Sequence, residues 1–104
     1  MARFDVYAHP DAELREQTPY LVDVQNGFLD SLETRIVIPL RSSKYISNPL
    51  RDLNPIFEIA GGNVVLDTAA MAAFPTALLK RPATDLARHA AVVTGAIDTL
   101  LGSH

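Results

Sequence analysis

Residues 35–40 limit the possible folds more than any other segment, because they are almost continuously apolar and β-branched. A run of this kind is typical of a strand buried on both faces. Pro39 lacks a backbone N–H, so we expect the strand to end there or to lie at a sheet edge. The chain has 104 residues, and we expect residues 1–104 to form a single domain around one core.

Several other segments have the pattern of short strands. Residues 3–8 begin with strand-like alternation, and residues 21–25 alternate loosely. Residues 55–60 and 64–68 flank Gly61, Gly62 and Asn63, which predicts a hairpin because glycine accepts positive φ. Residues 76–80 are interpreted as one more strand. Residues 69–73 are predicted to form one helical turn, ended by Phe74 and Pro75, and residues 41–48 a short helical or irregular crossing.

The C-terminal segment has helical spacing instead. Thr84 or Asp85 can cap a helix, which we expect to continue to about Leu101 and to stop at Gly102. Its apolar residues recur at the period of one helix face: Leu86, Val93, Ile97, Leu100 and Leu101. Six or seven short strands followed by one helix predict an antiparallel sheet or small barrel closed by the helix.

No constellation of catalytic residues stands out. The chain has no cysteine and therefore no disulfide or thiolate metal site. His9, His89 and His104 are scattered in the sequence, and we expect all three to be solvated. The carboxylates Asp23 and Asp30 define no cleft for acid–base chemistry. We therefore expect a binding protein rather than an enzyme, with no metal and no cofactor.

The charge balance disfavours nucleic acid as a partner. The net charge is −3, whereas proteins that bind phosphates directly normally carry a basic patch. Arg35, Arg41, Lys44 and Arg51 are clustered in sequence, and we interpret them as a solvated face beside a strand. No apolar run is long enough to span a membrane, and the N-terminus lacks a signal-peptide pattern, so we expect a cytoplasmic location.

The segments FDVYAHPD, LVDVQNGFLD, RIVIPL and LNPIFEI occur in an order that resembles the CcdB family of bacterial toxins. The resemblance covers nearly the whole chain, and V-D-V-Q followed by V-I-P-L is its most specific part. It implies an SH3-like small antiparallel barrel or sheet with a C-terminal helix, and a homodimer.

The resemblance also implies a function and partners. Such toxins bind the A subunit of DNA gyrase and trap the enzyme on cleaved DNA, without making or breaking a bond themselves. A cognate CcdA-like antitoxin neutralises the toxin, and the two together repress their own operon. The toxin alone is not expected to bind DNA.

Candidate binding residues follow from both arguments. Phe28 and Leu29 are large apolar residues in an otherwise loop-like segment, so they either fill the core or contact a partner. The resemblance favours contact with gyrase, and it adds Asp98, Leu101 and Gly102 at the end of the helix. Asp98 stands where the family has asparagine.

The chain departs from the family at its C-terminus. The family ends in phenylalanine, tryptophan, glycine and isoleucine, and without gaps this motif falls on Leu101, Gly102, Ser103 and His104. A shift of one residue aligns the glycines and puts Leu101 at the tryptophan position. There is no tryptophan anywhere in the chain, and aromatic anchors are typical hot spots of binding.

Three alternatives stay open at this point. The protein could keep the fold and the antitoxin partner but have lost gyrase poisoning. It could instead be an endoribonuclease toxin of the MazF type, for which the basic stretch between residues 35 and 51 is the only candidate groove. Finally, Gly102-Ser103-His104 could derive from an added expression sequence.

Overall fold

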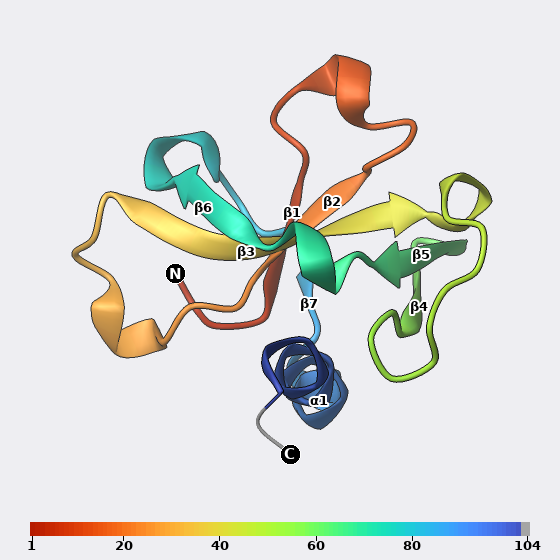
Figure 1. Ribbon diagram of the computed structural model, residues 1–104. Helices are drawn as coiled ribbons and strands as arrows, with labels where there is room; N and C mark the ends of the chain where they lie inside the picture. The colour runs from red at the N-terminus through yellow and green to blue at the C-terminus, as the bar shows by residue number, and fades with distance from the viewer. Residues whose placement is uncertain (103–104) are drawn as a thin grey trace.

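The computed structural model describes residues 1–102 (Figure 1). Within them, seven strands form one sheet, and the helix α1 (Ala90–Leu101) follows the last strand. The strands are β1 (Asp5–Ala8), β2 (Tyr20–Asp23), β3 (Thr34–Ser42), β4 (Ile56–Ile59), β5 (Gly62–Leu66), β6 (Ala72–Pro75) and β7 (Thr84–Asp85). The predicted class, mainly β with a C-terminal helix, is confirmed.

The sheet is an antiparallel half-barrel that stays open. Its strand order is β4-β5-β3-β2-β1-β7, and β6 pairs with the half of β3 that β5 does not reach. Within residues 1–102, β4 pairs only with β5, β7 only with β1 and β6 only with β3, so each of these three strands has a free edge. In Figure 1, α1 lies along one side of the sheet and β6 on the other side of β3.

Side-chain alternation along the strands gives the sheet two buried faces. On the face that α1 covers, Val22, Ile38 and Leu40 pack with Val93 and Ala96 of the helix. The remaining buried members of this larger core are Val6, Val24, Phe57, Val64, Leu66 and Leu86. The opposite face carries a smaller core of Tyr7, Leu21, Val37 and Leu79, with Phe74 of β6 packed against it. β3 is therefore buried on both faces, as its apolar sequence predicts.

Pro39 neither ends β3 nor marks a sheet edge, so that prediction is wrong. β3 continues to Ser42 and lies between β2 on one side and β5 and β6 on the other. The pairing with β6 stops at Val37, and the pairing with β5 starts at Leu40. Pro39 lies in this gap, where its carbonyl accepts a 2.9 Å hydrogen bond from the Asp67 N–H. The missing proline N–H therefore lies where β3 changes partners, just beyond the last pair of the β3–β5 ladder.

The segment around Phe74 and Pro75 differs from the prediction. The helical turn predicted at residues 69–73 lies slightly earlier, as the 3-10 turn η4 (Thr68–Ala70). It is followed by β6, which continues through Pro75. β6 pairs only with β3 among the described strands, and an edge strand of this kind tolerates proline. The strand expected at residues 76–80 is wrong, because Thr76–Leu78 forms a 3-10 turn, η5, before Leu79 enters the smaller core. The irregular crossing expected at residues 41–48 contains the end of β3 and the short turn η3 (Ser43–Tyr45).

The predicted hairpin is confirmed, but its turn lies one residue earlier. Ile59 of β4 pairs with Gly62 of β5, which leaves Ala60 and Gly61 as the two loop residues. Both have positive φ, 51° and 82°. Positive φ at both central positions is the geometry of a type I′ turn, whose twist matches that of the flanking strands.

The helix begins later than predicted. Thr84 and Asp85 form the short strand β7, and the Asp85 carboxylate accepts a hydrogen bond from the Ala87 N–H. A 3-10 turn, η6 (Ala87–His89), then leads into α1. The helix stops as predicted at Gly102, which has φ 71° and donates its N–H to the Asp98 carbonyl. Glycine favours this left-handed cap because it has no Cβ.

The N-terminal strand also starts later than predicted. β1 begins at Asp5 rather than at residue 3, because Phe4 has a φ of 75°, which is incompatible with a strand. β2 begins at Tyr20, one residue before the predicted run, and ends at Asp23, two positions before residue 25. Among residues 1–102, no helix combines the length and the apolar character that crossing a membrane requires.

Candidate protein-binding site

The loop between β2 and β3 carries the two apolar residues singled out in the sequence. It contains a 3-10 turn, η2 (Gly27–Leu29). The Asn26 side chain caps the turn by accepting a 2.9 Å hydrogen bond from the Phe28 N–H. The Leu29 N–H donates to the Asn26 carbonyl at 3.0 Å. A short polar side chain at this position satisfies backbone donors that the turn leaves unpaired, so the local sequence itself builds the turn.

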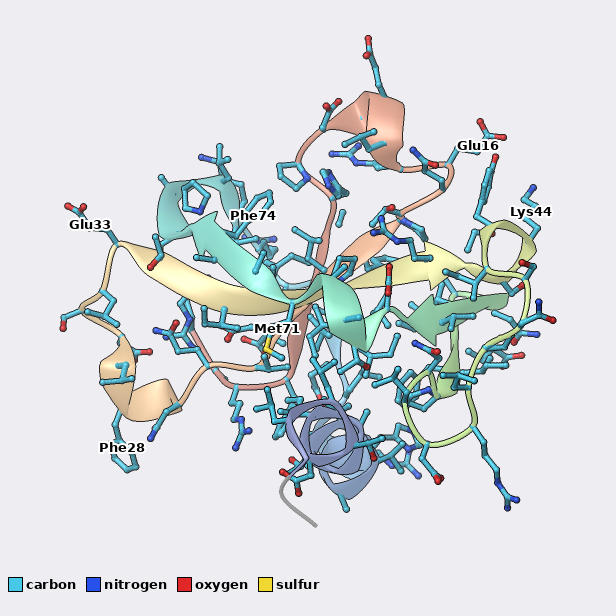
Figure 2. The ribbon with its side chains drawn as sticks, viewed as in Figure 1. Glu16, Phe28, Glu33, Lys44, Met71 and Phe74 are labelled. Atoms are coloured by element: carbon cyan, nitrogen blue, oxygen red, sulfur yellow. The ribbon has the colours of Figure 1, made fainter. Side chains whose placement is uncertain are left out.

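The turn presents its apolar side chains to solvent. Phe28 is 96% exposed and Leu29 is 46% exposed. Figure 2 shows Phe28 pointing outward from the body of the molecule. The core-filling interpretation is therefore wrong for Phe28, because its ring makes almost no contact with the rest of the chain. An exposed phenylalanine on an ordered turn is the type of side chain that anchors a protein interface.

A buried ion pair lies beneath this loop. Asp23, the last residue of β2, and Arg35, near the start of β3, both have 0% exposed side chains. The Arg35 Nε donates to Asp23 Oδ2 at 2.8 Å, and its Nη2 donates to Asp23 Oδ1 at 3.1 Å. This two-bond pairing of a guanidinium with a carboxylate is the strong geometry for such a pair.

The same arginine reaches the loop backbone. Its Nη2 donates to the Gln25 carbonyl at 3.3 Å, and its Nη1 lies 3.4 Å from both the Leu29 carbonyl and Asp30 Oδ1. The buried Gln25 side chain adds a 3.2 Å hydrogen bond from Nε2 to the Leu29 carbonyl. Its Oε1 accepts the Ile36 N–H of β3 at 2.9 Å. The last residue of η2 is thus bound by two side chains from inside the molecule.

The helix half of the candidate site is partly exposed. Leu101 is 68% exposed, and Gly102 forms the helix C-cap. Asp98 is half-buried, one turn before the cap. Ser103 and His104 lie outside the described residues, so the comparison with the family's closing motif stops at Gly102. Leu101 is the most exposed of the large apolar side chains in α1, and it stands where the family resemblance implies an aromatic residue.

The loop half and the helix half come from separate elements. In Figure 1 the β2–β3 loop and α1 lie on the same side of β3. Phe28 packs against neither the core nor α1, because nearly all of its surface is in solvent. A partner that contacts both halves would therefore have to span the space between them.

The three histidines have different environments. His9 is buried, so the expectation that it is solvated is wrong. Its Nδ1 accepts the Asp11 N–H at 3.0 Å, and its ring meets the edge of Phe74. Burial lowers the pKa of His9 below its ordinary value of 6.5. His89 is exposed beside Phe57, as expected, and His104 lies outside the described residues.

The basic stretch is not a continuous solvated face. Arg35 is fully buried with Asp23, which contradicts the interpretation for that residue. Arg41 pairs with Asp67 at 2.9 Å and donates to Thr18 Oγ1 at 2.6 Å. Lys44 and Arg51 are exposed as expected.

Within residues 1–102, no group of three or more acidic, histidine or cysteine side chains is arranged to hold a metal ion.

The buried network of Asp23, Gln25 and Arg35 is what sequence reasoning misses. The strand pattern of the sequence does contain a signal for this network. Asp23 pairs in register with Val37, so the side chains of Asp23 and Arg35 lie on the same face of the sheet as a diagonal pair. Opposite charges at such positions, each next to apolar strand residues, indicate a buried pair.

A comparison with models of protein families supplies independent evidence. The model described as CcdB protein matches residues 3–102. The match includes β1, the β2–β3 loop, the buried pair and the described part of the helix end.

Proposed function

The chain belongs to the CcdB family, and on this premise we propose that it binds the A subunit of DNA gyrase through the β2–β3 loop. The family consists of toxins of toxin–antitoxin modules that act on gyrase. The finer proposal is that this toxin traps gyrase on cleaved DNA by binding alone, and catalyses no reaction itself. Its partners in this proposal are gyrase, a second copy of the chain, and a CcdA-like antitoxin with which it represses its operon.

The observation that carries the proposal is the exposure of Phe28. Exposure of an apolar ring to water is unfavourable, and burying the ring fully in a partner stabilises the complex by about 1.5–3 kcal/mol. Leu29 beside it enlarges the apolar surface. Phe28 and Leu29 occupy the positions at which the family resemblance predicts gyrase contact.

The helix end supports a weaker contribution. Leu101 and Gly102 take the place of an aromatic motif, and replacing a buried aromatic anchor weakens binding by about 2 kcal/mol or more. Asp98 adds a carboxylate that needs a partner wherever an interface buries it. We therefore assign most of the gyrase affinity to the loop.

A supercoiling assay with gyrase from the host bacterium tests this function. The wild-type chain is expected to inhibit supercoiling at micromolar concentration and to accumulate cleaved DNA. Leu29→Ala is expected to weaken inhibition at least fivefold, whereas Leu50→Ala, which truncates an exposed leucine on another loop, is the matched control. Inhibition without cleaved DNA contradicts poisoning, and no inhibition at all contradicts gyrase as the target.

A second candidate function follows from the altered helix end. The chain would then bind its antitoxin and repress the operon without poisoning gyrase. Growth arrest on expression without the antitoxin excludes this version. An endoribonuclease activity has less support, because Arg35 and Arg41 are both paired with carboxylates. Incubation of the pure protein with RNA tests it, and an unchanged RNA ladder removes it.

A further inference from the structure

The Phe28 side chain has no packing contacts that could fix its position, because 96% of it is exposed. The direction in which it points is therefore set by the backbone of η2. Three side-chain hydrogen bonds hold two groups of that backbone: Asn26 accepts the Phe28 N–H, and Gln25 and Arg35 both donate to the Leu29 carbonyl. Two of the three bonds come from buried side chains. The geometry of the exposed ring thus depends on groups that lie out of solvent.

Arg35 uses every nitrogen of its guanidinium in this arrangement. Nε and Nη2 bind Asp23, Nη2 also binds the Gln25 carbonyl, and Nη1 binds Leu29 and Asp30. The planar fork lets one side of the group neutralise a buried carboxylate while the other side holds the loop. A lysine can make the first contact but has no second arm to make the other at the same time.

Stability alone is a weak reason to bury such a pair. Removing two charges from water is costly, and apolar side chains of similar volume often stabilise a protein as well or better. Here an apolar pair would fill the same space between β2 and β3. It would provide no donor for the Leu29 carbonyl and none for the Gln25 carbonyl.

We infer that Arg35, together with Gln25, is a positioning residue that orders the β2–β3 loop before gyrase binds and so aims Phe28 at its partner. The inference rests on the proposed function and deepens it. A loop that is already ordered loses less conformational entropy on binding, which raises affinity without adding a contact. Neither Arg35 nor Gln25 needs to touch gyrase for this effect.

The test compares Arg35→Lys with Arg41→Lys. Both substitutions replace an arginine of β3 that pairs with a carboxylate, but Arg41 binds Asp67 and Thr18 instead of the loop. The first measurement is hydrogen exchange of the Leu29 amide by NMR, in the full chain without gyrase. We expect exchange to be at least tenfold faster in Arg35→Lys and unchanged in Arg41→Lys, each referred to amides of the β2–β3 ladder.

The second measurement is the affinity of the same variants for the gyrase A subunit. We expect at least a tenfold loss for Arg35→Lys and less than a twofold change for Arg41→Lys. A double-mutant cycle with Phe28→Ala adds a readout that a general loss of stability would not change. If Arg35 acts through the ring, its substitution has little further effect once the ring is gone.

The outcomes separate this inference from the proposed function. Equal Leu29 exchange in Arg35→Lys and the wild type overturns the inference, and so does equal affinity. If the wild-type chain binds no gyrase, the proposed function falls, and the exchange data still decide whether Arg35 orders the loop. Should Arg35→Lys fail to fold, Gln25→Ala replaces it. That variant removes the second donor to the Leu29 carbonyl, and unchanged exchange and affinity in it overturn the inference equally.

Discussion

Asp23 and Arg35 each have no exposed side-chain surface, so removing one leaves the other charge buried without its main partner. Asp23→Ala is expected to lower the free energy of unfolding by about 3–5 kcal/mol. Urea denaturation followed by circular dichroism measures this loss.

The Arg41–Asp67 pair provides the control. Its side chains are 30% and 23% exposed, so water screens the pair and can solvate the remaining charge. Asp67→Ala is expected to cost clearly less than Asp23→Ala, on the order of 1 kcal/mol. Equal losses in the two variants would contradict the argument from burial.

His9 makes the stability depend on pH. Its pKa is lowered in the folded chain because burial disfavours the charged imidazole, an effect that the nearby cations Arg15 and Arg41 reinforce and that Asp11 opposes. Below the ordinary value of about 6.5, the unfolded chain binds a proton more readily than the folded one. Stability therefore falls as the pH drops below that value and is fully present above it.

His9→Asn should remove this dependence, because asparagine keeps an acceptor near the Asp11 N–H but does not titrate. Urea denaturation of both proteins at pH 7.5 and pH 5.5 measures the difference. The wild type is expected to lose more stability between these values than the variant does. An identical loss in both would show that His9 does not contribute.

For single residues, the sequence indicates which side chains are unusual but not whether they are exposed or buried. The apolar loop residues Phe28 and Leu29 were identifiable because they break a polar segment. The burial of His9 and Arg35 was not, since polar residues are solvated by default. Their burial depends on which residues the sheet register places opposite them, and that register is not visible in a single strand.

The β4–β5 hairpin contains a residue in a conformation that suits it poorly. Ala60 has a φ of 51°, and a left-handed conformation costs a residue with a Cβ roughly 1–2 kcal/mol. Ala60→Asn creates an Asn-Gly pair, the preferred sequence for a type I′ turn. We expect the free energy of unfolding to rise by about 1 kcal/mol, measured by thermal or urea denaturation.

Gly61→Ala is the opposing variant at the next position. Its φ of 82° strains any residue with a side chain, although a Cβ there would meet no atom within 4 Å. This variant is expected to be less stable than the wild type. If Ala60→Asn does not stabilise the protein or Gly61→Ala does not destabilise it, the turn assignment is wrong.

At the scale of elements, the hairpin, the central strand and the helix stop were predictable because local residues determine them. The path around Pro39 and β6 was not. Proline is excluded from a central strand only where its missing N–H would face a partner, and at Pro39 the partner strands change. The predicted start of α1 was also wrong, because Thr84 and Asp85 pair with β1 instead of beginning the helix.

In the whole molecule, the candidate site has two parts: a loop held by side chains of the core, and a helix end without the aromatic residue that the family resemblance implies. The fold class and the family were predictable from ordered sequence segments that extend over nearly the full chain. The sequence shows only part of the difference between the loop half and the helix half of the site. The missing tryptophan shows in the sequence, whereas the exposure of Phe28 and its anchoring by Arg35 require the three-dimensional arrangement.

The proposed function requires the β2–β3 loop to bind gyrase without an aromatic anchor on the helix. Calorimetric titration of the gyrase A subunit with the wild-type chain, Phe28→Ala and the control Leu50→Ala tests it most directly. We expect micromolar or tighter binding for the wild type and for Leu50→Ala, and at least tenfold weaker binding for Phe28→Ala, with all three equally stable. No binding by the wild type, or equal binding by Phe28→Ala, would show that the loop does not bind gyrase through Phe28.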